Sequence, residues 1–339
     1  MKKETLKIKE VVRLSPEAVQ LSFDIPSAIQ EEFRFQAGQY LTLGTTINGE
    51  NIRRSYSICT APHEEDLAVG IKALPKGIFS NHAQDLTAGD LLEVSIPEGR
   101  FTYQPREKKQ LGIAAGSGIT PLMSILKTHL KNDPSHEFCL VYGNKSPEKT
   151  LFYNELLALE KECAGRLQIH WIFSQSSEEG AGFGRIDAAF LKHVLKGKTN
   201  QPTYICGPEE MIHLSKDTLL GMGYAQEQIL FELFFSSATE ATPVKDDGAG
   251  QLEIICDGET HVLELSGESV LDAALKHKID VPYSCQGGVC SSCIAKVTTG
   301  KARMEQNQIL TDSEVAEGLV LTCQAYAETP KIVVDFDDV

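Results

Sequence analysis

Apolar and polar residues alternate through the first hundred positions, in short stretches bounded by Pro, Gly, Asn and Asp. A period of two predicts β-strands that bury one face. Short strands at this spacing are typical of a small antiparallel barrel. The predicted strands are Leu6–Val12, Val19–Phe23, Tyr40–Thr45, Arg54–Thr60, Leu67–Lys72 and Leu91–Ile96.

From about Gln110 the pattern changes to short apolar runs that alternate with longer stretches of helical period. The expected strands are Leu111–Ala115, Phe138–Tyr142, Gln168–Phe173, Thr203–Cys206 and Ile229–Phe234. The expected helices are Pro121–Leu130, Lys149–Cys163, Ile186–Leu195 and Glu209–Met222. Strands and helices in alternation predict a doubly wound parallel sheet.

A third pattern follows a stretch that is poor in large apolar residues, which is typical of a linker. Beyond it, Leu252–Cys256 and His261–Leu265 predict a hairpin around Asp257-Gly258, and Ser269–His277 predicts a helix. The chain is therefore expected to be multi-domain. The expected ranges are a barrel at 1–106, an α/β domain at 107–235, a linker at 236–249 and a small α+β domain at 250–339.

Composition narrows the function classes. The 339 residues are 42% hydrophobic and 23% charged, as in a folded globular protein. No apolar run approaches the roughly 20 residues of a membrane helix, and the N-terminus has no signal-peptide pattern, so no membrane association and a cytoplasmic location are expected. A net charge of −15 argues against a nucleic-acid partner.

The negative charge is concentrated near the C-terminus. Residues 250–339 contain 15 Asp and Glu against 6 Lys and Arg, and therefore carry −9 of the total. Two interpretations are open: an ordinary solvated surface, or an acidic face that steers a basic partner protein.

Four of the nine cysteines form one pattern, Cys285-x4-Cys290-x2-Cys293, with Cys323 following after 29 residues. This is the spacing of plant-type [2Fe-2S] ferredoxins, in which four thiolates hold two irons. Structural zinc is the alternative, but zinc sites usually pair two short cysteine knuckles. The sequence therefore predicts an iron–sulfur cluster. The other five cysteines stand singly in the sequence and are expected to be small buried apolar residues. They are Cys59, Cys139, Cys163, Cys206 and Cys256, and only Cys206 is expected to have a further role.

Two segments of the barrel carry candidate flavin-binding residues. Arg54 and Tyr56 share one strand face, where an arginine can bind phosphate and an aromatic ring can cover a flavin. Gly77 and Ser80 offer a turn at a helix start that could hold a diphosphate. Each segment alone is weak evidence for flavin binding, since an ordinary polar strand could have the same residues.

The α/β segment carries two glycine turns at strand ends. Ala115–Pro121 runs from a strand through two glycines to Thr120, expected as a helix cap, and Pro121, expected at the first helical position. Cys206-Gly207-Pro208 repeats the order of strand, glycine, proline and helix. Ligands of open α/β sheets collect at this edge, so a nucleotide pyrophosphate is expected there.

The order R-x-Y-S, G-x-x-S, G-x-G-x-T-P and C-G-P resembles the ferredoxin–NADP reductase superfamily, with a plant-type ferredoxin fused at the C-terminus. The resemblance covers nearly the whole chain. It implies an FAD-binding antiparallel β-barrel, a doubly wound NAD(P)-binding domain and an α+β ferredoxin domain of the β-grasp type. It also implies an NAD(P)H-dependent oxidoreductase that passes electrons through FAD and a [2Fe-2S] cluster to an oxygenase.

The resemblance also implies roles for single residues. Arg54 is expected to bind an FAD phosphate, Tyr56 to cover the flavin ring and Ser57 to lie near its reactive nitrogen. Ser57, Cys206 and Glu232 are the expected catalytic group, although Leu230 and Leu233 stand where relatives often carry His and Arg. The expected cofactor-binding residues are Arg54, Tyr56, Ser57, Ile58, Lys72, Gly77, Ser80, Gly116, Ser117, Gly118, Thr120, Pro121, Asn144, Lys145, Ser174, Cys206, Gly207 and Pro208.

Two questions stay open from sequence. NADPH is favoured over NADH because Lys145 and Ser174 could receive a 2′-phosphate and no acidic residue ends the second strand, whereas Gln175 stands where many NADPH enzymes carry Arg. The acceptor is expected to be a mono- or dioxygenase component or a desaturase. A redox sensor or carrier without turnover is the alternative from another class.

Overall fold

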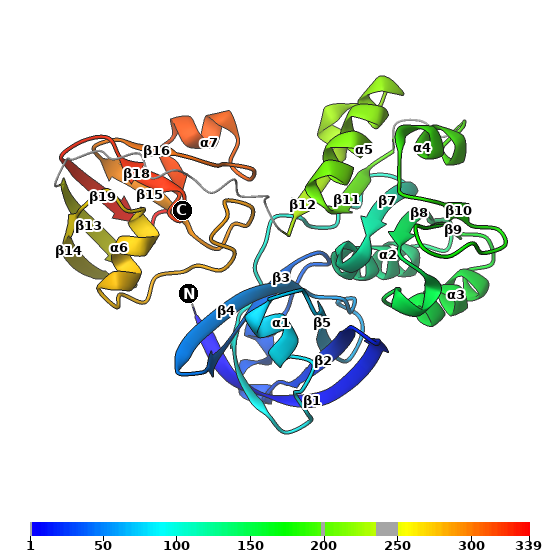
Figure 1. Ribbon diagram of the computed structural model, residues 1–339, viewed down its shortest axis with the longest axis horizontal. Helices are drawn as coiled ribbons and strands as arrows, with labels where there is room; N and C mark the ends of the chain where they lie inside the picture. The colour runs from blue at the N-terminus through cyan, green and yellow to red at the C-terminus, as the bar shows by residue number, and fades with distance from the viewer. Residues whose placement is uncertain (1, 198–200, 235–249) are drawn as a thin grey trace. The chain divides into compact units, whose positions relative to one another are not determined.

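The structure is a computed structural model of the chain and describes residues 2–197, 201–234 and 250–339. Residue contacts divide it into two compact units, Lys2–Leu233 and Phe234–Val339 (Figure 1). The first unit contains the expected barrel and the expected α/β sheet. The expected linker, residues 236–249, lies outside the described residues.

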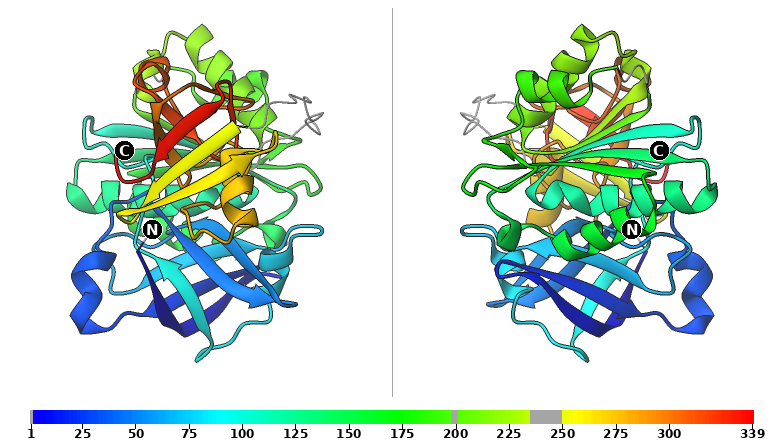
Figure 2. Two further views of the ribbon diagram at one scale, coloured as in Figure 1. Left: turned by 90° about the vertical axis from the view of Figure 1, so that its left-hand side faces the viewer. Right: turned by 90° about the vertical axis from the view of Figure 1, so that its right-hand side faces the viewer.

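The N-terminal strands form an antiparallel barrel in the order β4-β3-β6-β1-β2-β5. Its strands are β1 (Lys3–Ser15), β2 (Ala18–Asp24), β3 (Tyr40–Ile47), β4 (Glu50–Ser57), β5 (Leu67–Lys72) and β6 (Leu91–Ser95), accompanied by η1 (Ser27–Phe33) and α1 (Ile78–His82). The sheet closes where Ile58 pairs with Val69 and the Cys59 N–H donates to the Ala68 carbonyl at 2.9 Å. Figure 2 shows the barrel strands, in blue and cyan, from two sides. Alternate side chains such as Ile8 and Leu41 are fully buried in the barrel core.

The fourth barrel strand differs from its predicted range. It begins at Glu50 instead of Arg54 and ends at Ser57 instead of Thr60. The cause is a tight hairpin at Asn48-Gly49, whose residues have φ of 53° and 83° and join β3 directly to β4. Asn-Gly favours this turn because both residues tolerate positive φ.

The second half of this unit is a parallel sheet in the order β10-β9-β8-β7-β11-β12. The strands are β7 (Lys109–Ala115), β8 (Glu137–Asn144), β9 (Leu167–Phe173), β10 (Gly182–Phe183), β11 (Thr203–Gly207) and β12 (Ile229–Leu233). The helices are α2 (Ile119–Asn132), α3 (Tyr153–Glu162), α4 (Ala188–Val194) and α5 (Glu209–Gly221), with 3-10 turns η2 (Gly116–Gly118), η3 (Pro147–Lys149) and η4 (Gln226–Gln228). Figure 1 shows α2 and α3 on one face and α4 and α5 on the other, which confirms the doubly wound prediction.

Three helix starts of the α/β sheet were predicted wrongly, those of α2, α3 and α4. The helix α4 begins at Ala188 instead of Ile186, because Asp187 caps it by accepting from the Phe190 N–H. The helix α2 begins at Ile119, so Thr120 lies inside its first turn and is not the cap. Its hydroxyl donates instead to the Ser117 carbonyl at 3.0 Å. The helix α3 begins at Tyr153 instead of Lys149, because the chain first makes a 3-10 turn and then takes a left-handed residue at Phe152, with φ of 57°.

The C-terminal unit has a mixed five-stranded sheet in the order β14-β13-β19-β15-β17 and a two-stranded ribbon of β16 and β18. Its elements are β13 (Gly250–Cys256), β14 (Glu259–Leu265), α6 (Val270–Lys276), β15 (Ile294–Thr299), β16 (Ala302–Met304), α7 (Asp312–Ala316), β17 (Leu319–Leu321), β18 (Ala325–Ala327) and β19 (Lys331–Asp335). The predicted hairpin and helix are confirmed. Asp257-Gly258 forms the turn with positive φ, and the Ser269 hydroxyl caps α6 by accepting from the Asp272 N–H at 3.1 Å.

No helix among the described residues is both long enough and apolar enough to cross a bilayer. The C-terminal unit has its own hydrophobic core, to which β13, β19 and α6 contribute fully buried side chains, among them Leu252, Val334 and Val270. The helix α6 packed on a mixed sheet is the expected α+β arrangement.

Candidate functional site

The strand β4 presents the candidate flavin residues. Arg54 is exposed and its guanidinium donates to the Arg53 carbonyl at 2.6 Å. Tyr56 packs against Phe79 of α1, with ring centroids 5.5 Å apart, and burial raises the pKa of its phenol. An exposed guanidinium and a supported aromatic ring on one strand face suit a phosphate and a flat ring, the two parts of FAD.

The turn before α1 is built closely around Ser80. The Ser80 hydroxyl accepts from the Leu74 N–H at 3.2 Å, and the Asn81 amide donates to the Leu74 carbonyl at 2.8 Å. A Cβ at Gly77 would lie 2.3 Å from the Ser80 Oγ, so any larger residue would displace the Ser80 hydroxyl from this turn. The pair Gly77 and Ser80 therefore forms a compact turn beside Tyr56 and Phe79, as a diphosphate cradle requires.

The carboxyl ends of β7 and β11 meet at the turn Gly116–Gly118, which follows β7. A Cβ on Gly118 would lie 2.1 Å from the Cys206 carbonyl oxygen, and Gly116 has φ of +57°. The buried Tyr142 supports this turn, because its hydroxyl donates to the Gly116 carbonyl at 2.9 Å. Sequence reasoning assigned no such role to Tyr142. The backbone of Gly116, Ser117 and Gly118 is thus held at the sheet edge where nucleotides bind.

Basic side chains gather beside the same turn. Lys72 ends β5 from the barrel, and its ammonium lies 3.9 Å from the position of a Cβ on Gly116. Burial lowers the pKa of Lys72, and Lys145 and Lys149 lower it further while Glu17 opposes them. The Ser174 N–H donates to the Asn144 carbonyl at 2.9 Å, which brings the ends of β8 and β9 together. Positive charge around a glycine turn fits the phosphates of a dinucleotide.

The three candidate catalytic residues come together from different strands. The Ser57 hydroxyl of β4 lies 3.5 Å from a Glu232 carboxyl oxygen of β12, at the long limit of a hydrogen bond. Cys206 of β11 is the ladder partner of Glu232 and is fully buried. Burial raises the pKa of the Cys206 thiol well above its usual range, and the neighbouring Glu232 adds to this rise.

Glu232 is half-buried, and the burial of its carboxyl group raises its pKa from 4.5 to about 8, with the Ser57 hydrogen bond acting against the rise. Burial therefore favours the protonated form of this carboxyl group, and the Ser57 hydroxyl donates to one of its oxygens. Leu233 beside it is 3% exposed, so the position where relatives often carry a charged residue is apolar here.

A folded pKa above the unfolded value has a direct consequence for stability. The native state keeps a proton on Glu232 that the unfolded chain releases, so this group destabilises the fold as pH rises from about 4.5 to about 8. We expect Glu232→Gln to flatten the fall of the thermal unfolding midpoint across this window. The matched control is the exposed Glu227, whose Gln variant should keep the wild-type dependence. An unchanged pH dependence in Glu232→Gln contradicts the assignment.

The cysteine loop of the C-terminal unit gathers four sulfur atoms. The Cys293 thiol lies 3.4 Å from the Cys323 sulfur, and the thiols of Cys290 and Cys323 hydrogen-bond to the Cys285 sulfur and lower its pKa. The Gly287 N–H also points at the Cys285 sulfur, at 3.4 Å. The Cys285 sulfur therefore contacts the sulfurs of Cys290 and Cys323, and Cys323 also contacts Cys293. Four converging thiols with an inward amide fit a [2Fe-2S] cluster.

The loop is held by the chain around residue 306. Gly288 has φ of +70°, and a Cβ there would lie 2.9 Å from the Gln306 carbonyl oxygen. The Gln324 amide donates to the Gln286 carbonyl at 3.0 Å and so joins the segment of Cys323 to the three-cysteine loop. Sequence reasoning did not identify Gln324. The other five cysteines are buried, as predicted: Cys59, Cys139, Cys163, Cys206 and Cys256.

Known domain families match the chain in three separate ranges. The "Oxidoreductase FAD-binding domain" matches residues 5–103, the "Oxidoreductase NAD-binding domain" matches 113–217 and the "2Fe-2S iron-sulfur cluster binding domain" matches 254–328. These ranges fall within the three domains expected from sequence, whose exact boundaries stay predictions. The iron–sulfur match favours a cluster over zinc at the four cysteines.

Relatives match over nearly the full length. One component of the 1,2-phenylacetyl-CoA epoxidase of Escherichia coli (strain K12) is 38% identical, with 98% of this chain and 97% of the relative covered. The ferredoxin reductase component of the 3-ketosteroid-9-alpha-monooxygenase of Mycobacterium tuberculosis is 30% identical, with 98% and 96% covered. The solved phthalate dioxygenase reductase, 24% identical, shares the fold with a TM-score of 0.64 and 98% of both chains covered.

The domain matches, the relatives and the shared fold agree with the resemblance read from the sequence motifs. The three-domain arrangement is confirmed, as are FAD, a nicotinamide nucleotide and a [2Fe-2S] cluster as the cofactors of these domains. The chain belongs to the ferredoxin–NADP reductase superfamily, as a flavin and iron–sulfur NAD(P)H oxidoreductase of the kind that supplies electrons to oxygenases.

Proposed function

We propose that this chain is the reductase of a phenylacetyl-CoA epoxidase, and that it passes electrons from NADPH through FAD and the cluster to a multi-subunit di-iron oxygenase in the cytoplasm. The observation that carries the proposal is the 38% identity to the Escherichia coli epoxidase component over 98% of the chain, against 30% for the ketosteroid monooxygenase reductase. The aromatic substrate binds the oxygenase and not this chain.

The residues divide the work of the reaction among the three domains. FAD, when bound, accepts a hydride and gives up electrons singly, and the cluster carries single electrons. Arg54 binds a phosphate of FAD, and Tyr56 lines the side of the flavin ring. The Ile58 side chain, expected there from sequence, is instead fully buried in the barrel core and can offer only its backbone. Ser57 and Glu232 hold a proton beside the ring, because burial raises the pKa of the Glu232 carboxyl to about 8.

The preference for NADPH rests on the ends of β8 and β9. Two backbone hydrogen bonds hold the segments of Lys145 and Ser174 side by side. The Gln175 N–H donates to the Lys145 carbonyl at 2.8 Å, and the Ser174 N–H donates to the Asn144 carbonyl at 2.9 Å. An ammonium and a hydroxyl at this edge can bind a 2′-phosphate, whereas an NADH site would place a carboxylate there.

The C-terminal unit supports docking of a basic partner. Its acidic excess includes Asp312 and Glu317 of the α7 region, which are exposed and flank Val315, an apolar side chain that is 40% exposed. We expect electron transfer to the oxygenase to slow several-fold as ionic strength rises from about 0.01 M to 0.2 M, because salt screens exposed charges. A neutral quinone acceptor, which has no charge to steer, is the control. A salt-independent rate with the oxygenase contradicts an acidic docking face.

The partner is tested by reconstitution. The purified reductase is mixed with the oxygenase subunits of a phenylacetyl-CoA epoxidase, and separately with the oxygenase component of a ketosteroid monooxygenase. Coupled NADPH oxidation and epoxide formation only with the first supports the proposal. Turnover with the second and none with the first makes this chain the reductase of another oxygenase. Failure to reduce any one-electron acceptor leaves a redox carrier, which contradicts the proposal entirely.

A further inference from the structure

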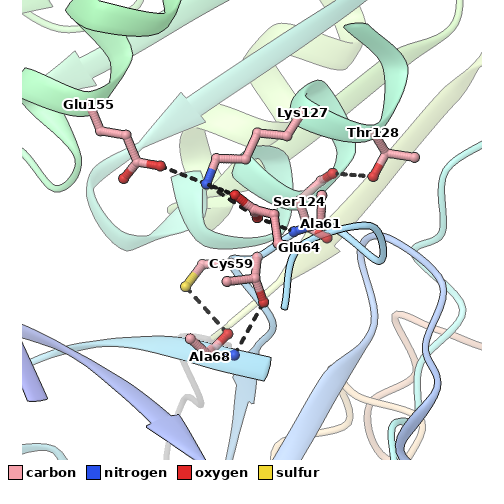
Figure 3. Close-up of polar contacts among 9 residues, drawn as sticks. Cys59, Ala61, Glu64, Ala68, Ser124, Lys127, Thr128 and Glu155 are labelled. Atoms are coloured by element: carbon pink, nitrogen blue, oxygen red, sulfur yellow. Dashed lines mark hydrogen bonds and ion pairs between the residues drawn. The ribbon is translucent and has the colours of Figure 1, made fainter. Parts of the chain in front are cut away.

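A nearly buried lysine joins the barrel to the α/β sheet of the first unit. Lys127 lies on α2, and its side chain is 13% exposed. Its ammonium contacts a Glu155 carboxyl oxygen of α3 at 2.6 Å and the Glu64 carboxyl of the barrel loop at 3.2 and 3.4 Å (Figure 3). Burial lowers the pKa of Lys127, but the two carboxylates more than offset this, so its pKa lies above the usual value.

On the barrel side, Glu64 is held in place by hydrogen bonds within its own turn. The Glu64 carboxyl also accepts from the Ala61 N–H at 2.5 Å, within the turn that Glu64 closes by donating its own N–H to the Ala61 carbonyl. That turn follows the end of β4, where the Cys59 thiol donates to the Ala68 carbonyl of β5 (Figure 3). The Thr60 hydroxyl accepts from the Ala68 N–H. Glu64 is thus fixed to the strand that carries the candidate flavin residues.

The other side of the contact carries the nucleotide turn. The helix α2 continues directly from Gly116–Gly118, and its first turn touches the barrel where a Cβ on Gly70 would lie 2.7 Å from the Thr120 methyl. Lys127 is two turns farther along the helix. Near the end of α2, the His129 ring accepts from the Tyr103 hydroxyl, 3.1 Å away on the segment that connects the two domains.

The contacts of Thr120, Lys127 and His129 differ in how strongly they can hold the orientation of α2 on the barrel. The contact at Thr120 is apolar and has no directional bond, and Tyr103 lies on the covalent connection between the two domains. The ion pair of Lys127 with Glu64 lies between them along α2. Lys127 is 13% exposed and Glu64 is 34% exposed, so this half-buried charged contact ties α2 to the barrel loop and opposes rotation of the helix on the barrel. Hydride transfer requires reacting atoms about 3 to 3.5 Å apart, so a small rotation matters.

We propose that Lys127 is a positioning residue for hydride transfer: through Glu64 it sets the angle between the helix that carries the nucleotide turn and the strand that carries the flavin residues. Lys127 touches neither cofactor in this account. The inference rests on the proposed cofactor contacts of β4 and of the Gly116–Gly118 turn, and it adds a residue that none of the sequence motifs contains.

The charged triad of Lys127, Glu64 and Glu155 contains its own matched control. Glu64→Gln removes the negative charge that pairs with Lys127 from the barrel and leaves the ion pair with Glu155 inside the α/β domain. Glu155→Gln removes the charge of the shorter of the two contacts and leaves the ion pair with the barrel. If the triad only stabilised the fold, Glu155→Gln would be at least as harmful as Glu64→Gln. A positioning role reverses this order.

The experiment measures three quantities on the purified holoprotein: the limiting rate of flavin reduction at saturating coenzyme, the dissociation constant for oxidised coenzyme, and the thermal unfolding midpoint. We expect Glu64→Gln and Lys127→Gln to slow flavin reduction about 10-fold or more, with coenzyme binding changed less than about 3-fold. Glu155→Gln and the exposed Lys131→Gln should stay within about 2-fold of wild type, and Lys127→Arg should recover most of the rate.

The outcomes separate this inference from the proposed function. Equal slowing in Glu64→Gln and Glu155→Gln, or lower unfolding midpoints with unchanged flavin reduction, overturns the positioning role. If Lys127→Gln does not fold, the two glutamate variants decide the matter. Wild-type protein that binds no FAD or is not reduced by coenzyme contradicts the proposed function instead, and full FAD absorbance in each variant excludes that explanation for a slow rate.

Discussion

Cys290→Ser should lose the visible absorption of the iron–sulfur cluster and keep the absorption of FAD. The Cys290 thiol contacts the Cys285 sulfur within the set of four, and an alcohol is a far poorer ligand for iron than a thiolate. Because the flavin residues belong to the other unit, coenzyme should still reduce the flavin at close to the wild-type rate. Electron transfer to a one-electron protein acceptor should fall by about 100-fold or more.

Iron content and the visible spectrum measure this result directly. Cys256→Ser is the matched control, because Cys256 is a buried cysteine of the same unit that lies outside the loop. It should retain the cluster. A full cluster spectrum in Cys290→Ser would show that the four-cysteine assignment is wrong.

Gly118→Ala should prevent productive binding of the nicotinamide coenzyme. The added methyl would overlap backbone atoms of the neighbouring strand end, 2.1 Å from the Cys206 oxygen and 2.4 Å from its carbonyl carbon. Neither strand end can yield cheaply, so the turn must move by more than an ångström. Displacements of this size can slow a reaction about 100-fold.

The measurement is the rate of flavin reduction as a function of coenzyme concentration, together with FAD content. Gly221→Ala is the control: Gly221 ends α5 in helical conformation, and a Cβ there meets no atom within 4 Å. It should be as active as wild type and slightly more stable, because alanine favours a helix over glycine. Wild-type kinetics in Gly118→Ala contradict the placement of the nucleotide turn.

The fold could be predicted from sequence wherever one periodicity ran without interruption. The predicted strand Leu67–Lys72 matches β5 residue for residue, and Asp257-Gly258 marked the hairpin of the C-terminal unit. The boundaries of β4 were missed because Asn48-Gly49, a strong hairpin signal, was not used. The start of α3 was missed because Phe152 takes a left-handed conformation that its residue type does not favour.

The candidate site was predictable only where its residues belong to motifs. Ser57, Cys206 and Glu232 were expected on the strength of a family resemblance, and the structure brings all three together. The supporting residues are different. Tyr142 and Lys127 contact elements that are remote in sequence, and no spacing or composition encodes which turn or carboxylate they reach.

The central claim is that electrons pass from nicotinamide through flavin to the cluster within this one chain. An anaerobic titration with NADPH, repeated with NADH, tests it most directly while the flavin and cluster absorption bands are followed together. We expect stoichiometric NADPH to bleach the flavin, the cluster band to follow, and NADH to require a higher concentration. A protein with bound FAD but neither iron nor a cluster band, or a cluster that stays oxidised after the flavin is reduced, would contradict the account.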